Sequence, residues 1–173
     1  MRLAGITQES TVDGPGLRFV LFAQGCVHNC PYCHNPESWV NDGGKEFTVK
    51  EVVRLLKKHR KIKRGITFSG GEPFLQAAEL FEVAVAARNM GLDVVTYTGF
   101  TYEQLMQDAD DSRLALISAS NILIDGKYIH NLRDIELQFC GSSNQRLIDV
   151  EATQRCGEVM LWSGTRGLST FSA

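Results

Sequence analysis

The chain has 173 residues, 22% of them charged and 43% hydrophobic, with a formal net charge of −2. This length predicts a single domain, residues 1–173, with a core large enough to be stable without disulfides, and the near-neutral charge does not favour a nucleic-acid partner. Residues 1–10 lack the apolar core of a signal peptide, and no run approaches the ~18 apolar residues of a membrane span. We therefore expect a cytoplasmic protein that binds neither nucleic acid nor membrane.

Strand and helix patterns alternate along the chain. Apolar, β-branched runs predict buried strands at residues 17–23, 65–71, 92–99 and 121–126. Helices are predicted between these strands, at residues 48–61, 76–91 and 101–107. Capping boxes, Thr48 with Glu51 and Thr101 with Gln104, mark the start of the first and third helices. Gly91 marks the end of the second helix.

Hydrophobic spacing gives each of the two longer helices a buried face. The predicted inward positions are Val52, Val53 and Leu56 in the first helix, and Leu80, Phe81, Ala84 and Val85 in the second. After Val150 the tail contains one apolar run, which we interpret as an edge strand. The polar end that follows is interpreted as disordered.

Strands separated by helices are typical of βαβ units and a parallel sheet. A closed eight-fold barrel needs about 250 residues, so we predict an α/β fold built as a partial, open (βα) barrel of parallel strands, with a doubly wound sheet as the alternative. In both folds the site lies at the carboxyl ends of the strands. The loops expected to meet there are the cysteine loop (residues 25–35), "SGGEP" (69–73), "YTGF" (97–100) and "DGK" (125–127).

The cysteine loop follows the first predicted strand and contains three cysteines: Cys26, Cys30 and Cys33. In a reducing compartment such a group indicates metal binding or catalysis rather than disulfides. A structural zinc site needs four ligands, and His28 or His34 would supply the fourth. An iron–sulfur cluster held by three cysteines instead keeps one iron open for a substrate, and we favour this interpretation. Cys140 and Cys156 have no close partner and are interpreted as structural thiols.

The segment "CVHNCPYC" (26–33) resembles the CxxxCxxC signature of the radical S-adenosylmethionine family. Two neighbouring segments are similar to the activating enzymes of glycyl radical enzymes: "VDGPGLR" (12–18) and "CHNPESW" (33–39). Further segments resemble the activating proteins of anaerobic ribonucleoside-triphosphate reductases: "TYTGFTYEQL" (96–105), "ILIDGKYIHNLRD" (122–134) and "GSSNQR" (141–146). The resemblance covers the chain from about Val12 to Asp149.

The resemblance implies a [4Fe-4S] cluster and S-adenosylmethionine as cofactors. Cys26, Cys30 and Cys33 would hold the cluster, Tyr32 would lie beside the adenine, and the backbone around Cys33 and His34 would also border the cofactor. No catalytic side chain is implied, because the radical forms on the cofactor.

The resemblance also implies cofactor contacts at the other strand ends. The family's Gly-Gly-Glu motif meets the methionine amino group, and the glycines leave room for close backbone approach. The residues that match it are Ser69, Gly70, Gly71 and Glu72. The strand ends that border the ribose and methionine would contribute Thr96, Thr98, Asp125 and Lys127.

The implied activity is that of a radical S-adenosylmethionine oxidoreductase. It would take an electron from a low-potential donor such as flavodoxin, cleave S-adenosylmethionine reductively and abstract hydrogen from a glycine of an anaerobic ribonucleoside-triphosphate reductase. The alternatives are a pyruvate formate-lyase-type activase, a small-molecule radical enzyme, and a non-catalytic iron–sulfur or zinc module for electron transfer or scaffolding. The basic stretch Lys57–Arg64 is interpreted as a solvated helix end, with docking of an acidic electron donor as the alternative.

Overall fold

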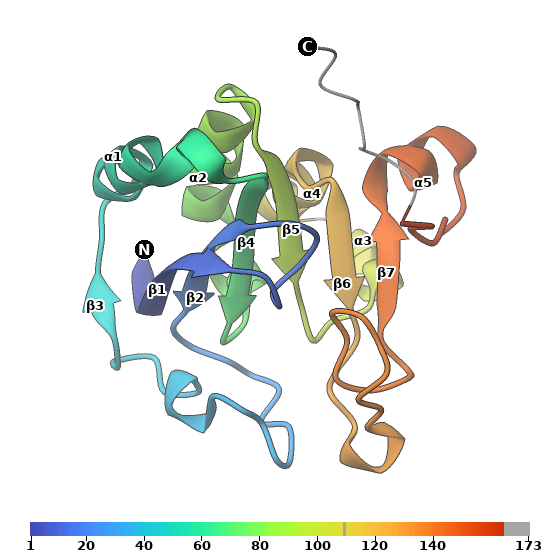
Figure 1. Ribbon diagram of the computed structural model, residues 1–173. Coiled ribbons are helices and arrows are strands. Elements are labelled where there is room, and N and C mark those ends of the chain that lie inside the picture. The colour runs from blue at the N-terminus through green and yellow to red at the C-terminus, as the bar shows by residue number, and fades with distance from the viewer. Residues whose placement is uncertain (109, 165–173) are drawn as a thin grey trace.

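A computed structural model describes residues 1–108 and 110–164 (Figure 1). The strands are β1 (Arg2–Ser10), β2 (Arg18–Ala23), β3 (Lys45–Glu46), β4 (Gly65–Gly70), β5 (Asp93–Tyr97), β6 (Ile122–Asp125) and β7 (Arg146–Asp149). The α-helices are α1 (Val49–His59), α2 (Ala77–Arg88), α3 (Tyr102–Asp108), α4 (Asp111–Ala119) and α5 (Val150–Cys156). Short 3-10 helices are η1 (Pro36–Ser38), η2 (Arg60–Ile62), η3 (Pro73–Gln76) and η4 (His130–Leu132).

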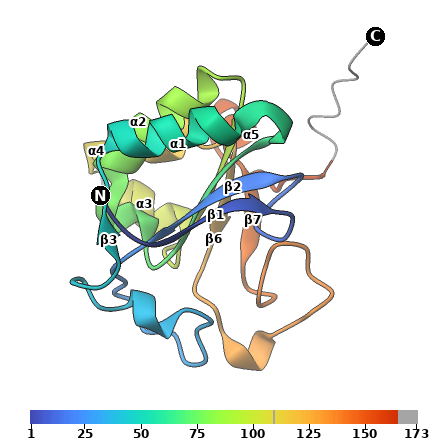
Figure 2. The ribbon, with the colours of Figure 1, turned by 60° about the vertical axis from the view of Figure 1, so that its left-hand side comes forward.

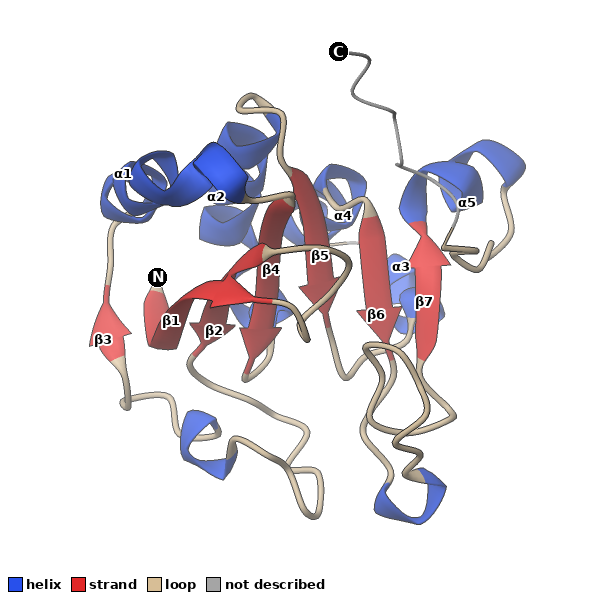
Figure 3. Ribbon diagram, in the orientation of Figure 1, coloured by secondary structure: helices blue, strands red, loops and turns tan. Residues whose placement is uncertain are grey.

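One sheet of seven strands, in the order β3-β1-β2-β4-β5-β6-β7, organises the fold (Figure 3). The central strands β2, β4, β5 and β6 pair in parallel, as predicted. The outer strands β1, β3 and β7 pair antiparallel to their neighbours. The fold is therefore mixed α/β with a largely parallel sheet, whose outermost strands β3 and β7 do not pair with each other in the described residues, so the sheet is not closed into a barrel.

The helices α1, α2 and α4 cover one face of the sheet, as two views of the molecule show (Figures 1 and 2). The main hydrophobic core lies between these helices and the strands. It includes Phe19 of β2, Phe68 of β4 and Leu80 of α2. No helix in the part of the chain that the structure describes is long and apolar enough to cross a membrane.

Both predicted capping boxes are confirmed. The Thr48 backbone N–H donates to Glu51 Oε2 at 2.8 Å, and the Glu51 N–H donates back to Thr48 Oγ1 at 3.3 Å. Before α3, the Thr101 N–H donates to Gln104 Oε1 at 2.8 Å, and the Gln104 N–H donates to Thr101 Oγ1 at 3.2 Å. These bonds satisfy N–H groups that a helix start leaves unpaired.

The predicted buried face of α2 is correct in part. Leu80 and Ala84 are fully buried and Phe81 packs at the margin of the core, but Val85 is 38% exposed. The helix buries Val83 and Ala87 instead. The reason is that α2 packs against both α1 and α4 as well as the sheet, so its buried face is broader than a single stripe.

The tail differs from the predicted edge strand. The Asp149 side chain accepts a hydrogen bond from the Ala152 N–H at 2.8 Å and starts helix α5, which Gly157 ends with a φ of 78°. After α5, the apolar run does meet the outer edge of β7, through an antiparallel bridge between Leu161 and Ile148 and backbone bonds from the Asp149 N–H to the Met160 carbonyl and from the Trp162 N–H to the Leu147 carbonyl. The predicted edge strand is therefore present only as this short bridge. The polar end that was interpreted as disordered lies outside the described residues from 165 onward.

The basic stretch lies far from the cysteine loop. It follows the end of α1 and leads into the amino-terminal end of β4, whereas the cysteine loop follows the carboxyl end of the parallel neighbour β2 (Figure 1). Lys63 Nζ is 3.2 Å from Glu9 Oε1, and Arg64 Nε is 2.9 Å from Asp93 Oδ2. This placement favours the interpretation as a helix end.

A buried arginine fastens the amino-terminal ends of β2, β4 and β5. The Arg18 side chain is fully buried, and its Nη1 lies 2.6 Å from Asp93 Oδ1. Its Nε donates to Thr67 Oγ1 at 2.6 Å, and its other donors reach the carbonyls of Pro15 and Ile66. Burial lowers the pKa of Arg18 from its ordinary value, and Asp93 opposes this shift. The segment "DGPG" (13–16) thereby lies at this end of β2, away from the cysteines.

We expect Arg18→Met to lower the free energy of unfolding by about 3 to 5 kcal/mol, because it leaves a carboxylate and several buried acceptors without their donor. Arg2→Met is the matched control, since Arg2 pairs with Glu46 in a partly exposed ion pair that contributes about 1 kcal/mol or less. Urea denaturation followed by circular dichroism measures both. Equal losses in the two variants would contradict the role assigned to Arg18.

Candidate functional site

The cysteine loop extends from the carboxyl end of β2. Backbone bonds hold its two ends, from the Cys26 N–H to the Trp39 carbonyl at 3.2 Å and from the Cys33 N–H to the Cys30 carbonyl at 3.1 Å. Asn29 and Tyr32 adopt positive φ values of 47° and 61°, which are uncommon for residues other than glycine and turn the chain tightly.

The three thiols of this loop are free and half-buried. Burial raises the pKa of Cys26 and of Cys30, while backbone N–H groups near each sulfur oppose that shift. The Cys33 sulfur accepts a hydrogen bond from the Asn35 N–H at 3.4 Å. N–H groups aimed at sulfur stabilise thiolate ligands of iron–sulfur clusters, so this donor set fits such a cluster.

Within the residues that the structure describes, no three His, Cys, Asp or Glu side chains are gathered as a metal-binding group. The thiols of Cys26, Cys30 and Cys33 share one loop, and besides burial the charge of a neighbouring thiolate also acts to raise the pKa of Cys26 and of Cys30. Each iron of a [4Fe-4S] cluster takes its own cysteine, so such a cluster does not need the three sulfurs to meet at one point.

The "SGGEP" loop packs directly against the chain that enters the cysteine loop. The Gly71 N–H donates to the Ala23 carbonyl and the Glu72 N–H to the Gly25 carbonyl, both at 2.8 Å. A Cβ atom on Gly71 would lie 2.3 Å from the Gly25 carbonyl oxygen, and Gly70 has a φ of 89°. The glycines thus serve a contact between two loops of the chain, which the motif alone did not reveal.

The Glu72 side chain is fully buried beneath these loops. Its Oε1 accepts from the Phe74 N–H at 3.0 Å, and its Oε2 accepts from the Gly99 N–H at 2.9 Å. Thr98 Oγ1 lies 3.0 Å from both carboxylate oxygens, and His28 Nε2 lies 2.7 Å from Oε2. Both oxygens are thus bonded to groups of the chain itself, and the carboxylate joins the loops that surround it.

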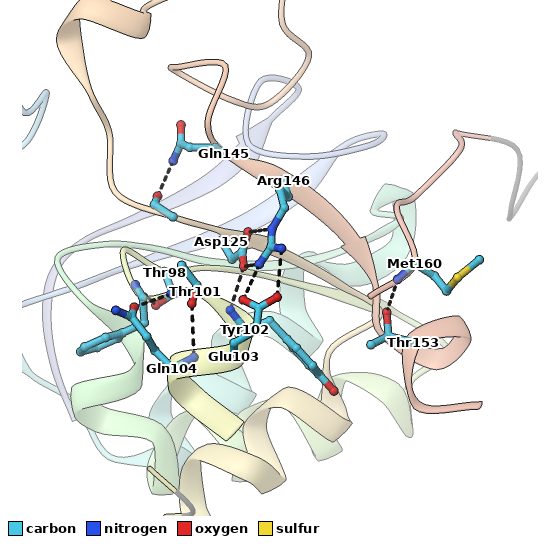
Figure 4. A network of polar contacts seen from close by, with 12 residues as sticks. Thr98, Thr101, Tyr102, Glu103, Gln104, Asp125, Gln145, Arg146, Thr153 and Met160 are labelled. Atoms are coloured by element: carbon cyan, nitrogen blue, oxygen red, sulfur yellow. Dashed lines mark hydrogen bonds and ion pairs between the residues drawn. The ribbon is translucent and has the colours of Figure 1, made fainter. Parts of the chain in front are cut away.

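The Asp125 carboxylate lies against the start of helix α3 and the side chain of Arg146 (Figure 4). Its carboxylate accepts from the Tyr102 N–H at 2.8 Å and from Arg146 Nε at 3.0 Å. Arg146 also binds Glu103, and these hydrogen bonds lower the pKa of Glu103 to about 2. Asp125 therefore joins β6, β7 and α3, and its carboxylate is already engaged.

The structure does not bring the other residues singled out in the sequence, Thr96, Lys127 and Cys140, to one place. Thr96 is buried on the helix side, where its Oγ1 lies 2.7 Å from Ser120 Oγ. Lys127 is exposed, and its charge acts on the Cys30 thiol, which places it near the cysteine loop. Cys140 packs beside Val95 on the opposite face, where burial raises its pKa to about 11.

The β6–β7 loop (126–145) meets the cysteine loop through aromatic contacts. Tyr32, which is 71% exposed, stacks on His130 with ring centroids 4.1 Å apart. The ring centroids of Tyr128 and the exposed His34 are 6.3 Å apart. The Tyr128 hydroxyl oxygen lies 3.0 Å from His130 Nδ1. The sequence pattern gave no role to Tyr128 or His130, although both lie within the segment "ILIDGKYIHNLRD".

Known proteins resemble this chain over most of its length. It matches the family described as the 4Fe-4S single cluster domain over residues 12–148. The anaerobic ribonucleoside-triphosphate reductase-activating proteins of Escherichia coli (strain K12) and Vibrio cholerae serotype O1 are 33% and 36% identical, each over 141 residues. These matches span 78% of this chain and 89% and 88% of the two proteins.

A second kind of relative is also similar. The pyruvate formate-lyase-activating enzyme of Clostridium pasteurianum is 35% identical over 133 residues, which span 72% of this chain and 55% of that protein. The free cysteines Cys26, Cys30 and Cys33, with their spacing and their loop, lie inside the matched region. The chain therefore belongs to the 4Fe-4S single cluster domain family, together with the radical S-adenosylmethionine activating enzymes.

Proposed function

We propose that this chain activates an anaerobic ribonucleoside-triphosphate reductase by generating a glycyl radical on it. The observation that carries the proposal is the loop with three free thiols beside the glycine-rich "SGGEP" loop, at the carboxyl ends of parallel strands. Such strand ends are where α/β folds of this kind place their cofactors. The two reductase-activating relatives, matched over 89% and 88% of their length, support the choice of partner.

In this proposal Cys26, Cys30 and Cys33 would hold a [4Fe-4S] cluster, and the residues around them would bind S-adenosylmethionine. The two cofactors together, with an electron from an external donor, would supply the radical chemistry that generates the glycyl radical on the partner. The chain's own contribution is to bind and orient. Tyr32 would lie beside the adenine, the backbone around Cys33 and His34 would also border the cofactor, and the exposed Lys127 would contribute from near Cys30.

In the Gly-Gly-Glu motif, the backbone and the Glu72 side chain have different roles. In this proposal the methionine amino group donates to backbone carbonyls of the half-buried segment 69–71, while the Gly71 N–H stays bonded to Ala23 and the buried Glu72 carboxylate holds the surrounding loops. Thr98 acts through Glu72, because its hydroxyl donates to that carboxylate. Asp125 would also act indirectly, because its carboxylate accepts a hydrogen bond from Arg146.

The chain acts as a single domain in the cytoplasm, as a partial (βα) barrel whose open side would admit a loop of the partner. The electron comes from a low-potential donor such as flavodoxin. The second candidate function is activation of a pyruvate formate-lyase, which the 35% identity to such an activating enzyme supports.

We expect Cys26→Ser to abolish cluster binding, because a three-cysteine site has no spare ligand. Cys140→Ser and Cys156→Ser are the matched controls, since Cys140 packs against the opposite face of the sheet and Cys156 ends α5. Iron and sulfide analysis after anaerobic reconstitution measures the outcome. A Cys140→Ser protein without iron, beside a Cys26→Ser protein that keeps it, would refute the cluster assignment.

The partner assignment is tested by mixing the reconstituted protein with S-adenosylmethionine, dithionite and either an anaerobic ribonucleotide reductase or a pyruvate formate-lyase. Electron paramagnetic resonance should detect a glycyl radical with the reductase and none with a reductase whose radical-site glycine is replaced by alanine. A radical on the lyase alone would favour the second candidate. Failure to cleave S-adenosylmethionine at all would favour a non-catalytic module.

A further inference from the structure

His28 lies between two proposed cluster ligands and yet points away from them. It stands two residues after Cys26 and two before Cys30, and its side chain is only 5% exposed. Its ring meets Phe100 edge-on, with ring centroids 4.5 Å apart. The sequence offered His28 only as an alternative zinc ligand, but the structure gives its Nε2 a different partner, the Glu72 carboxylate at 2.7 Å.

The direction of this hydrogen bond follows from the other contacts of Glu72. Backbone N–H groups of Phe74 and Gly99 donate to its two oxygens, so the carboxylate acts as an acceptor. An ionised carboxylate can only accept, and the ring nitrogen of His28 is then the donor. A hydrogen bond to a buried charged group is stronger than one between neutral groups, and the histidine is the contribution of the cysteine loop to this site.

The "YTGF" loop (97–100) leaves space for the His28 ring. A Cβ atom on Gly99 would lie 2.3 Å from His28 Cδ2 and 2.6 Å from its Nε2. Only a residue without a side chain can therefore occupy position 99 while His28 holds this place. Phe100 closes the site on another side of the ring.

We propose that His28 is a positioning residue, which sets the course of the cysteine loop by binding Glu72. Glu72 belongs to the "SGGEP" loop and also accepts from Thr98 and Gly99 of the "YTGF" loop. The pair thus fixes the segment between Cys26 and Cys30 relative to two other strand-end loops. The expected effect on cofactor binding rests on the proposed function, whereas the effect on the loop does not.

A pair of amide substitutions tests the geometry. The side-chain nitrogen of glutamine can reach the place of Nε2, whereas asparagine is one methylene shorter and falls short of Glu72. We expect His28→Gln to keep the loop in place and His28→Asn to release it. Val27→Ala is the control, because Val27 lies in the same segment and its side chain is 57% exposed.

The first measurement uses the iron-free protein. Alkylation by iodoacetamide, mapped by peptide mass spectrometry, should be faster at Cys26 and Cys30 in His28→Asn than in the parent, with Cys140 unchanged as an internal reference. His28→Gln and Val27→Ala should alkylate at the parent's rate. Circular dichroism verifies the fold of each variant. Equal rates in all four proteins, or equal acceleration in His28→Gln and His28→Asn, would overturn the proposal.

The second measurement is calorimetric titration of reconstituted protein with S-adenosylmethionine. His28→Asn should keep its iron but bind the cofactor about tenfold more weakly or worse, as is typical when a group that orients a ligand is lost, and His28→Gln should restore affinity. Unchanged affinity in His28→Asn would contradict the proposal. If the parent protein itself fails to bind S-adenosylmethionine, the proposed function fails, while the alkylation rates still decide the role of His28.

Discussion

The buried carboxylate of Glu72 is the interaction on which the candidate site depends. Burying a carboxylate away from water costs free energy unless hydrogen bonds from the protein replace those to water. Here the donors come from three loops: His28 from the cysteine loop, Phe74 from its own loop, and Thr98 and Gly99 from the loop after β5. Because no single loop can satisfy the charge, the three are held together, and the carboxyl ends of β2, β4 and β5 become one edge.

The opposite end of the same strands is held by a charge of the other sign. The Arg18 guanidinium, fully buried, binds Asp93 and Thr67 where β2, β4 and β5 begin. The two charged groups thus secure both ends of the central parallel strands, and the hydrophobic core secures one face. Across the carboxyl edge, the stacked rings of Tyr32 and His130 bring the β6–β7 loop against the cysteine loop, so the site has both a buried support and an exposed rim.

Local sequence signals predicted the parts of the fold that depend on local physics. The apolar runs located β2, β4, β5 and β6 to within two residues, and the capping boxes at Thr48 and Thr101 formed as expected. The antiparallel strand β1 was missed because its residues are mostly half-exposed and lack a continuous apolar run. The hydrogen bonds of Glu72 with Thr98 and of Asp125 with Arg146 were not predicted, because these partners lie 26 and 21 residues away along the chain. No local sequence pattern predicts such pairs.

Hydrogen exchange of a Glu72→Gln protein tests most directly whether this carboxylate holds the three loops together. The amide that replaces one oxygen would face the existing donors with N–H groups of its own. If the account is correct, mass spectrometry will show faster exchange in residues 25–35, 69–76 and 97–101 together, while the strand β6 keeps its protection. Faster exchange confined to residues 69–76, around the substituted position, would show that the loops are held independently and would contradict the account.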